Sequence, residues 1–436
     1  MNNLSITHYI PLIGPFILAQ KKLQKENGLN FTLNGVYSFP GFKNNEQHIE
    51  FNDPSFVVNY FEDENLGELI TQDSNLEPWK KLVEKYDIKK SNIVTGVPPC
   101  AGLSMLNSNN SCSDKVRGCD AIQNNWMFSA LKFYLATDSD VMVIENAPGL
   151  ATTGLPLVSK MRRILDDNSI DRKLQLIKTS AYHHGIPQNR HRTFLIVHKQ
   201  KHFIRLKNKK HEYQSLEQFL ETVQYKNNDP CFFNTKEYPE LSEFLKFIKQ
   251  HSEFIDEFKA MPSPKVKPLW KLILPHVEKN PHLLDGFEEL TNTFKHIQRK
   301  KSMNKGFWDG SPTLVKGHVN AVISKNRLSI FNPLDNYQSL LKVRHFMHLM
   351  GIPIEFDLKD PTNTWKHITQ NVPVNAAADA ILWAIECLDS KSETIQYKDD
   401  FIIQDNSKGD IYNTIYNSHK SKINMSNEMH LFSKAS

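Results

Sequence analysis

The sequence predicts an α/β fold in which a doubly wound, mostly parallel sheet has helices on both faces and is joined by a smaller basic domain. Two observations predict this fold. Over about the first 200 residues, short apolar runs alternate with segments of helical periodicity, and a stretch rich in Lys, Phe and His follows. With 436 residues, the chain is long enough for both parts to bury a core.

Three apolar runs predict buried strands at residues 91–97 (SNIVTGV), 141–145 (VMVIE) and 193–198 (TFLIVH). Between the first two, residues 122–135 carry apolar side chains at helical spacing and predict a helix. In a sheet of this kind, ligands bind at the carboxyl ends of the strands. The residues that follow the first two strands are therefore the first place to look for chemistry.

The change of composition along the chain predicts four segments. Residues 1–198 form the first part of the large domain, and residues 199–305 form the small basic domain, which opens with six Lys or Arg and no acid between residues 199 and 211. Helical patterning returns at 340–350 and at about 375–388, so residues 306–388 rejoin the large domain. Residues 389–436 are polar and weakly patterned, which predicts a C-terminal extension that is either an appended arm or partly disordered.

Composition narrows the class of protein. The net charge of +5 permits a polyanionic partner without requiring one. The five cysteines are few and odd in number, which favours a reducing compartment over a disulfide framework. No apolar run reaches membrane-spanning length and no signal peptide is recognisable, so we expect a cytoplasmic protein with no membrane partner.

The first motif with chemical potential surrounds Cys100. It follows Pro98 and Pro99 at the end of a predicted strand, and Ser104 comes four residues later. Two prolines restrict the backbone and end the strand, which predicts an exposed, fixed thiol. For this motif alone, a small buried cysteine is the competing interpretation.

Two further motifs follow at strand ends. Glu145 and Asn146 end the second strand, where a solvated strand terminus is the plain alternative. Gln188, Arg190 and Arg192 lead into the third strand, where alternate positions share a face. Arginine suits the recognition of phosphate or carboxylate, although a surface ion pair is the simpler interpretation.

Taken in order, these motifs resemble those of the DNA (cytosine-5) methyltransferase family. The family has a Pro-Cys nucleophile motif, then Glu-Asn-Val, here with Ala147 in place of Val, then Gln-x-Arg-x-Arg. The resemblance skips the basic segment and resumes at Gly310 and at residues 344–353. It ends at Asn371-Val372-Pro373-Val374, ahead of the last helix.

The resemblance implies a Rossmann-like methyltransferase fold and a DNA-modifying enzyme of the restriction–modification kind, from a bacterial cell or a phage-infected host. Cys100 is implied as the nucleophile that attacks carbon 6 of a flipped-out cytosine. Glu145 is implied as the proton donor to N3, and Arg190 and Arg192 as groups that orient the base. The remaining implied substrate-binding residues are Ser104, Asn146 and Gln188. Residues 199–305 are implied as a target-recognition domain whose Lys and Arg contact DNA phosphates, and we expect a monomer.

The family cofactor, S-adenosyl-L-methionine, is implied, but the segment that would receive it departs from the pattern. Pro15 stands where the last loop glycine is expected, and Ser38, Phe39 and Pro40 replace an expected acid, with Asp73 as a further candidate acid. The cofactor-binding residues implied are Gly14, Phe16, Phe39, Pro98, Asn371 and Val372.

Three interpretations stay open. The cofactor binds through a degenerate site with Phe16 or Phe39 stacked on adenine. Alternatively, the activated cytosine takes a methylene from methylene-tetrahydrofolate, or an aldehyde, and becomes hydroxymethylated. In the third, the chain is an inactive homologue that binds DNA without turnover. No metal is expected, because Cys112 and Cys119 lack a second ligand pair at metal-binding spacing.

Overall fold

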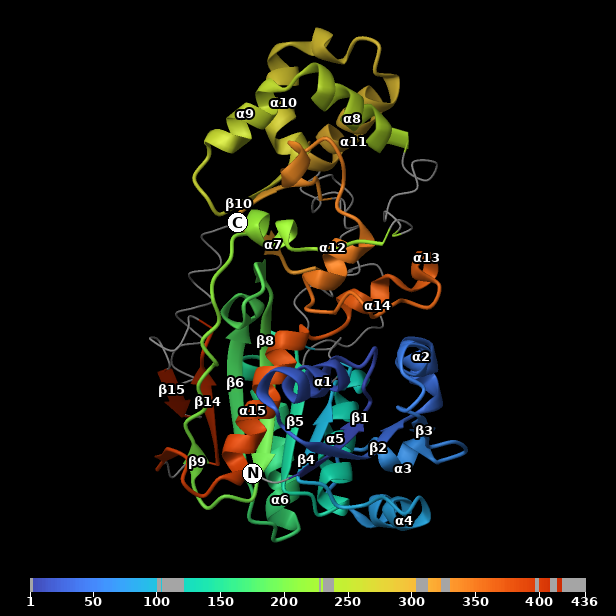
Figure 1. Ribbon diagram of the computed structural model, residues 1–436, viewed down its shortest axis with the longest axis vertical. Coiled ribbons are helices and arrows are strands. Elements are labelled where there is room, and N and C mark those ends of the chain that lie inside the picture. The colour runs from blue at the N-terminus through green and yellow to red at the C-terminus, as the bar shows by residue number, and fades with distance from the viewer. Residues whose placement is uncertain are drawn as a thin grey trace. The chain divides into compact units, whose positions relative to one another are not determined.

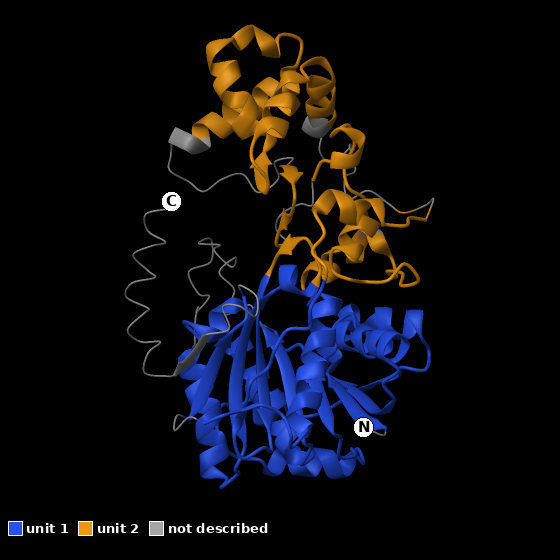
Figure 2. Cartoon of the chain, turned by 60° about the vertical axis from the view of Figure 1, so that its left-hand side comes forward, with its two compact units in different colours: residues 1–184, 191–211, 371–436 blue, residues 185–190, 212–370 orange. Residues whose placement is uncertain are grey.

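The computed structural model describes residues 3–99, 103, 121–226, 229, 239–302, 313–322, 330–396, 400–407 and 414–417. These residues form two compact units, shown in different colours in Figure 2. Unit 1 comprises residues 1–184, 191–211 and 371–436, and unit 2 comprises residues 185–190 and 212–370. Among the described residues, no helix is both long and apolar enough to span a membrane.

Unit 1 is built on a nine-stranded sheet with the order β15-β14-β6-β8-β5-β4-β1-β2-β3 (Figure 1). Neighbouring strands are parallel except that β8 runs antiparallel to β5 and β6, and β15 antiparallel to β14. The fold class predicted from the sequence is thereby confirmed. The strands are β1 (Leu4–Tyr9), β2 (Phe31–Ser38), β3 (Val58–Tyr60), β4 (Ile93–Gly96), β5 (Val141–Asn146), β6 (Lys173–Ser180), β8 (His191–His198), β14 (Phe401–Asp405) and β15 (Thr414–Asn417).

Helices flank this sheet. The central strand β5 is buried along its whole length, as expected for a parallel strand covered on both faces. Helix α15 packs against α1 and contacts β4, β5 and β8 (Figure 1), and its small residues Ala376, Ala377 and Ala380 allow a close approach. The helices of unit 1 are α1 (Pro15–Asn27), α2 (Lys43–Asn52), α3 (Leu66–Leu69), α4 (Glu77–Lys85), α5 (Asn125–Ala136), α6 (Leu155–Asp167) and α15 (Val374–Leu388).

The three predicted strands and the predicted helices are present within a few residues of their expected bounds. Part of the C-terminal extension is ordered, because β14 is a buried strand of the central sheet that pairs in parallel with β6. Its apolar run is only three residues long, Phe401 to Ile403, and polar sequence surrounds it. A run this short gives no usable periodicity, so only the pairing with β6 reveals it.

The first basic run also differs from its prediction. Within residues 199–211, Phe203, Ile204 and Leu206 are buried in unit 1, and β9 (Phe203–Ile204) pairs with β13 (Thr394–Ile395). The alternating cations point outward and meet acids of the same unit. The ion pairs join Lys199 to Asp138 and Asp140, and Arg205 and Lys207 to Glu393.

Unit 2 contains two hydrophobic clusters. The larger one joins α8 (Pro239–Gln250), α9 (Glu253–Ala260), α10 (Leu269–Lys279) and α11 (Glu288–Ser302). The smaller one joins α7 (Leu216–Glu221) and α12 (Val343–His348) with β11 (Thr313–Lys316) and β12 (Val319–Asn320). Unit 2 thus extends to Gln370, whereas the sequence predicted a return to the large domain at residue 306. Its other elements are β7 (Gln188–Asn189), β10 (Lys265–Pro268), α13 (Pro361–Thr364) and α14 (Lys366–Thr369).

Candidate active site

The first two motifs meet at one edge of the sheet. Strands β4 and β5 are parallel neighbours, with Gly96 opposite Ile144, so the residues after both strands lie at the same edge. Pro98 is buried just beyond β4, and Glu145 and Asn146 end β5. Cys100 and Ser104 lie outside the described residues.

A glycine brings the second motif against the segment that follows the first. A Cβ on Gly149, in the short helix η4 (Pro148–Ala151), would lie 2.4 Å from the carbonyl oxygen of Leu103. Real Cβ atoms do not approach a backbone oxygen this closely, so only glycine fits there. Leu103 is three residues after Cys100. The Glu-Asn-Ala-Pro-Gly turn is therefore packed closely against Leu103.

The antiparallel strand β8 delivers Arg192 to the same edge. Glu145 pairs with Phe194 in the sheet, so the start of β8 lies beside the end of β5. The Nε atom of Arg192 forms an ion pair with Oε1 of Glu145. The Glu145 side chain is only 3% exposed, and a buried carboxylate of this kind needs a charged partner. The sequence predicted both residues at the site, and the structure brings them into contact.

Asn146 is fully buried next to Glu145. Its Oδ1 accepts a hydrogen bond from the backbone N–H of Ala147 at 2.9 Å. Within the described part of the chain, its Nδ2 donor has no hydrogen-bond partner. A buried amide group with an unused donor is costly unless a ligand accepts from it. Binding of substrate by Asn146 stays a prediction.

Gln188 and Arg190 occupy a different environment from the one predicted. Both are fully buried in unit 2. The Gln188 side chain donates to the carbonyl oxygen of Leu349 at 2.6 Å and accepts from the N–H of Val322 at 2.9 Å. Arg190 donates to the carbonyl oxygens of Val322 at 2.6 Å and Thr369 at 2.8 Å. These contacts give both side chains a structural role, whereas the sequence predicted substrate binding and catalysis.

Replacing Arg190 with methionine is expected to lower the free energy of unfolding by about 3 kcal/mol, because two buried carbonyl groups lose charged donors. Urea denaturation followed by circular dichroism measures the change. The exposed Arg163 on α6 offers a control, and Arg163→Met is expected to leave the unfolding midpoint unchanged. A stable Arg190→Met protein that has lost only its catalytic rate would restore the catalytic assignment.

The resemblance implies that the family cofactor binds at the same edge of the sheet, near the ends of β1 and β2. The loop after β1 keeps a glycine-like backbone, with φ of 46° at Ile10, 52° at Leu12 and 89° at Gly14. The left-handed region costs a residue with a Cβ roughly 1–2 kcal/mol. Pro15 begins α1 directly after Gly14, and Phe16 is buried. The loop therefore has positive φ at three positions, only one of which is occupied by glycine.

Aromatic side chains fill the space around this loop. Tyr9 ends β1 and stacks on Phe133 of α5 at a centroid distance of 4.7 Å. Phe39, just after β2, meets Phe61 edge to face at 5.2 Å. Trp79 contacts all four rings. Each of these five side chains is 1% exposed or less. Phe39 is thus a core residue here, whereas one of the three interpretations of the sequence had Phe16 or Phe39 stacked on adenine.

A buried acid lies at the end of β2. The Oε1 atom of Glu46, on α2, accepts a hydrogen bond of 2.6 Å from Ser38, the last residue of β2. Burial raises the pKa of Glu46 to about 8, against the opposing effect of hydrogen bonds from Ser38, Tyr60 and the backbone of Leu12. These three partners belong to the ends of β2 and β3 and to the loop after β1. The Glu46 carboxyl group therefore joins these strand ends and the loop after β1.

The described residues at this edge do not form the acidic, glycine-lined cradle that the resemblance implies for S-adenosyl-L-methionine. Ser38 is engaged by Glu46, the aromatic rings are packed on one another, and Asp73 is paired with Lys132 at 2.7 Å. Asn371 and Val372, the other implied cofactor residues, are buried just before α15. Sequence inspection did not single out Glu46, although an acid eight residues after a strand-ending serine was a usable signal.

Comparisons with known proteins agree with this fold. The chain resembles the Dnmt2 methyltransferase of S. pombe at 11% identity and a TM-score of 0.50, covering 89% of this chain and 100% of that one. It also resembles a protein described as a DNA modification methyltransferase encoded within a prophage (E. coli), at 14% identity and a TM-score of 0.51, covering 88% of this chain and 98% of that one. Identities this low show the fold alone. No curated protein matches the chain significantly in sequence.

The family model described as C-5 cytosine-specific DNA methylase matches residues 55–386. The match spans most of the chain and includes the Pro-Cys, Glu-Asn and Gln-x-Arg-x-Arg motifs. The chain therefore belongs to the C-5 cytosine-specific DNA methylase family and is a DNA methyltransferase-like transferase.

Proposed function

We propose that this chain modifies carbon 5 of cytosine in DNA through a covalent adduct between Cys100 and carbon 6 of a flipped-out base. The ion pair of Glu145 and Arg192 carries the proposal, because it lies at the end of β5, beside the strand that leads to Pro98, Pro99 and Cys100. A buried, fixed carboxyl group at this place suits the recognition of the N3 and amino edge of cytosine.

The proposed reaction requires Glu145 to be protonated when the base is bound. It begins with addition of the Cys100 thiolate to carbon 6 while Glu145 delivers that proton to N3. The ring then carries an electron pair at carbon 5, which forms a bond to an electrophilic carbon. Loss of the carbon 5 proton to water, expulsion of the thiolate from carbon 6 and return of the N3 proton to Glu145 restore the aromatic ring and the enzyme. Arg192 orients the Glu145 carboxyl group, and Asn146 offers its unused donor to the substrate.

Carbon 6 of cytosine cannot be reached inside a duplex, so the proposal requires base flipping. We assign target recognition to unit 2. In support, α11 has Lys295 and Arg299 at exposed positions, where they can contact phosphates. The paired cations Lys199, Arg205 and Lys207 support this role less well, because acids of unit 1 already neutralise them.

The methyl donor implied by family membership is S-adenosyl-L-methionine, and methyl transfer is the first candidate reaction. The aromatic cluster and the buried Glu46 favour a second candidate, in which the adduct takes a folate-borne methylene or an aldehyde and leaves a hydroxymethyl group. Both candidates share every step up to formation of the carbon 5 nucleophile. They differ only in the electrophile.

Mass spectrometry of nucleosides from DNA incubated with the full chain and each donor tests the proposal. Formation of 5-methylcytosine that depends on S-adenosyl-L-methionine supports methyl transfer, and 5-hydroxymethylcytosine supports the second candidate. Unmodified DNA with every donor would overturn both and leave a DNA-binding homologue.

Replacing Cys100 with alanine is expected to abolish modification and to leave DNA affinity largely unchanged, because the thiol is needed for the covalent step alone. DNA containing 5-fluorocytosine and denaturing electrophoresis detect the covalent adduct directly. Cys387→Ala is the matched control, since Cys387 is a thiol buried in α15 outside the motif. An adduct formed by Cys100→Ala would remove Cys100 from the mechanism.

A further inference from the structure

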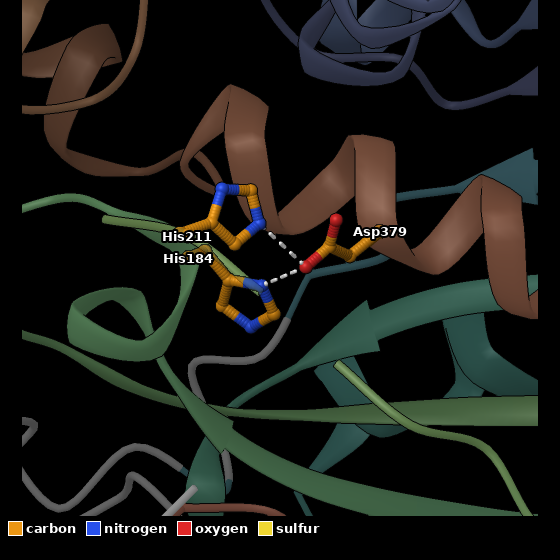
Figure 3. Close-up of side chains that lie close together, drawn as sticks. All are labelled: His184, His211 and Asp379. Carbon is orange, nitrogen blue, oxygen red and sulfur yellow. Dashed lines mark hydrogen bonds and ion pairs between the residues drawn. The ribbon is translucent and has the colours of Figure 1, made fainter. Parts of the chain in front are cut away.

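Two histidines and an aspartate meet in unit 1 on the side of α15 (Figure 3). Nδ1 of His184 lies 2.7 Å from Oδ2 of Asp379, and Nε2 of His211 lies 3.0 Å from the same oxygen. One potential ligand atom from each residue lies within 4.8 Å of the other two. Both imidazole rings are thus directed at a single carboxylate oxygen.

The cluster is largely removed from water. The side chains of His184 and Asp379 are exposed by 0% and 2%, and that of His211 by 19%. Among the described residues, Asp379 forms no ion pair with a lysine or arginine, and its ionic partners are the two histidines. A buried carboxylate with only imidazoles around it is well suited to a bound cation. The partial exposure of His211 gives the cation a route of entry.

A further hydrogen bond fixes the ring of His184. Its Nε2 lies 2.7 Å from the hydroxyl oxygen of Thr179, which is buried on β6. A hydroxyl group can accept as well as donate, so Nε2 can carry the proton and leave the Nδ1 lone pair directed at Asp379. Outer hydrogen bonds of this type orient the histidine ligands of metal sites.

The backbone around the cluster is held by α15. Asn375 Nδ2 donates to the carbonyl oxygen of His184 at 2.9 Å. Trp383 Nε1 donates to the carbonyl oxygen of Lys207 at 2.8 Å, four residues before His211. The helix that supplies Asp379 therefore also anchors the segments that supply both histidines. The three ligands are positioned without a contribution from the ion itself.

We propose that His184, His211 and Asp379 bind a divalent transition-metal ion of the Zn²⁺ class, with water as a fourth ligand. Two imidazole nitrogens and one carboxylate oxygen are a common ligand set for zinc, and a three-residue set leaves one position open. Imidazole-rich sites also accept Co²⁺, which serves as a spectroscopic probe. The sequence led us to expect no metal, because these three residues are far apart in the chain and no short spacing joins them.

The position of the ligands along the chain indicates what the ion does. His184 is the last residue of unit 1 before Gly185, and His211 is the last before Glu212. Asp379 follows eight residues after Asn371, where the chain re-enters unit 1. Two segments of unit 1 end at His184 and His211, and α15 follows the point where the chain re-enters unit 1. A single bound ion would therefore connect both segment ends to α15. This clamp is independent of the proposed reaction at Cys100.

Titration of the chelator-treated, tag-free full chain with Zn²⁺ by calorimetry, and with Co²⁺ by visible absorption, tests the proposal. One ion per chain is expected, with the intense ligand-field bands of four-coordinate Co²⁺ and a rise in melting temperature with Zn²⁺. Thr179→Val is expected to weaken binding by about 10- to 100-fold, and His211→Ala by more than Thr179→Val.

His202→Ala is the matched control, because His202 is an exposed histidine of unit 1. It is expected to bind metal as the unaltered chain does. His211 is partly exposed, so His211→Ala is expected to fold, and circular dichroism checks this. If the unaltered chain and His211→Ala bind zinc with equal stoichiometry and affinity, the proposed site is wrong. Both proteins have the same cysteines, so zinc bound by cysteines would be equal in the two. Absence of binding to the folded, unaltered chain would overturn it as well.

Discussion

Replacing Glu145 with glutamine is expected to lower the rate of cytosine modification by about 10²- to 10⁴-fold, the usual contribution of a positioned proton donor. Glutamine keeps the size and the hydrogen-bonding oxygen that Arg192 binds, but it cannot transfer a proton to N3 of cytosine. The fold and the affinity for DNA are expected to stay close to those of the unaltered chain. Single-turnover assays and fluorescence anisotropy measure the two quantities separately.

Glu62→Gln is the control for loss of a carboxylate, because Glu62 pairs with Lys43 at an exposed position. A second comparison uses Arg192. If Arg192 acts by orienting Glu145, the rate losses of Arg192→Met and Glu145→Gln will be far from additive in the double variant. An unchanged rate in Glu145→Gln would exclude Glu145 as the proton donor and leave it as a purely structural partner of Arg192.

Most of unit 1 could be predicted from the sequence because its signals are local. The runs at 91–97 and 141–145 are mostly apolar, as expected for strands buried on both faces, and they correspond to β4 and β5. The helix predicted from the spacing of apolar residues at 122–135 corresponds to α5. Glu145 and Arg192 could be predicted as site residues because each occupies a strand end with a recognisable neighbouring motif.

Contacts between distant residues could not be predicted. Arg190 differs from Arg192 by two positions and has the same side chain, yet it is buried against the carbonyls of Val322 and Thr369. Nothing in a local pattern distinguishes the two. The pairing of β14 with β6 has the same cause, since more than 200 residues separate Leu174 from Phe401.

Replacing Glu46 with glutamine is expected to remove a large pH dependence of stability. The folded-state pKa of Glu46 is raised by burial to about 8, above its ordinary value of 4.5. At a pH between these two pKa values, Glu46 is protonated in the folded chain and deprotonated in the unfolded chain. Stability therefore falls as pH rises, by about 1.4 kcal/mol per pH unit and about 4 kcal/mol between pH 5 and pH 8. Glutamine resembles the protonated acid and does not titrate, so this loss is absent in Glu46→Gln.

Urea denaturation at pH 5, 6, 7 and 8 measures the difference between the two chains. Glu50→Gln, at an exposed position of the same helix, controls for the removal of one carboxylate. The expected result is equal stability of the unaltered chain and Glu46→Gln near pH 5, with Glu46→Gln increasingly more stable toward pH 8. That result would support a closed end of β2, with Glu46 kept neutral by the strand ends that it joins.

Identical pH dependence in the two chains would instead mean that Glu46 is ionised in the folded state. An ionised, hydrated acid at the end of β2 is the group expected to bind the ribose hydroxyls of S-adenosyl-L-methionine.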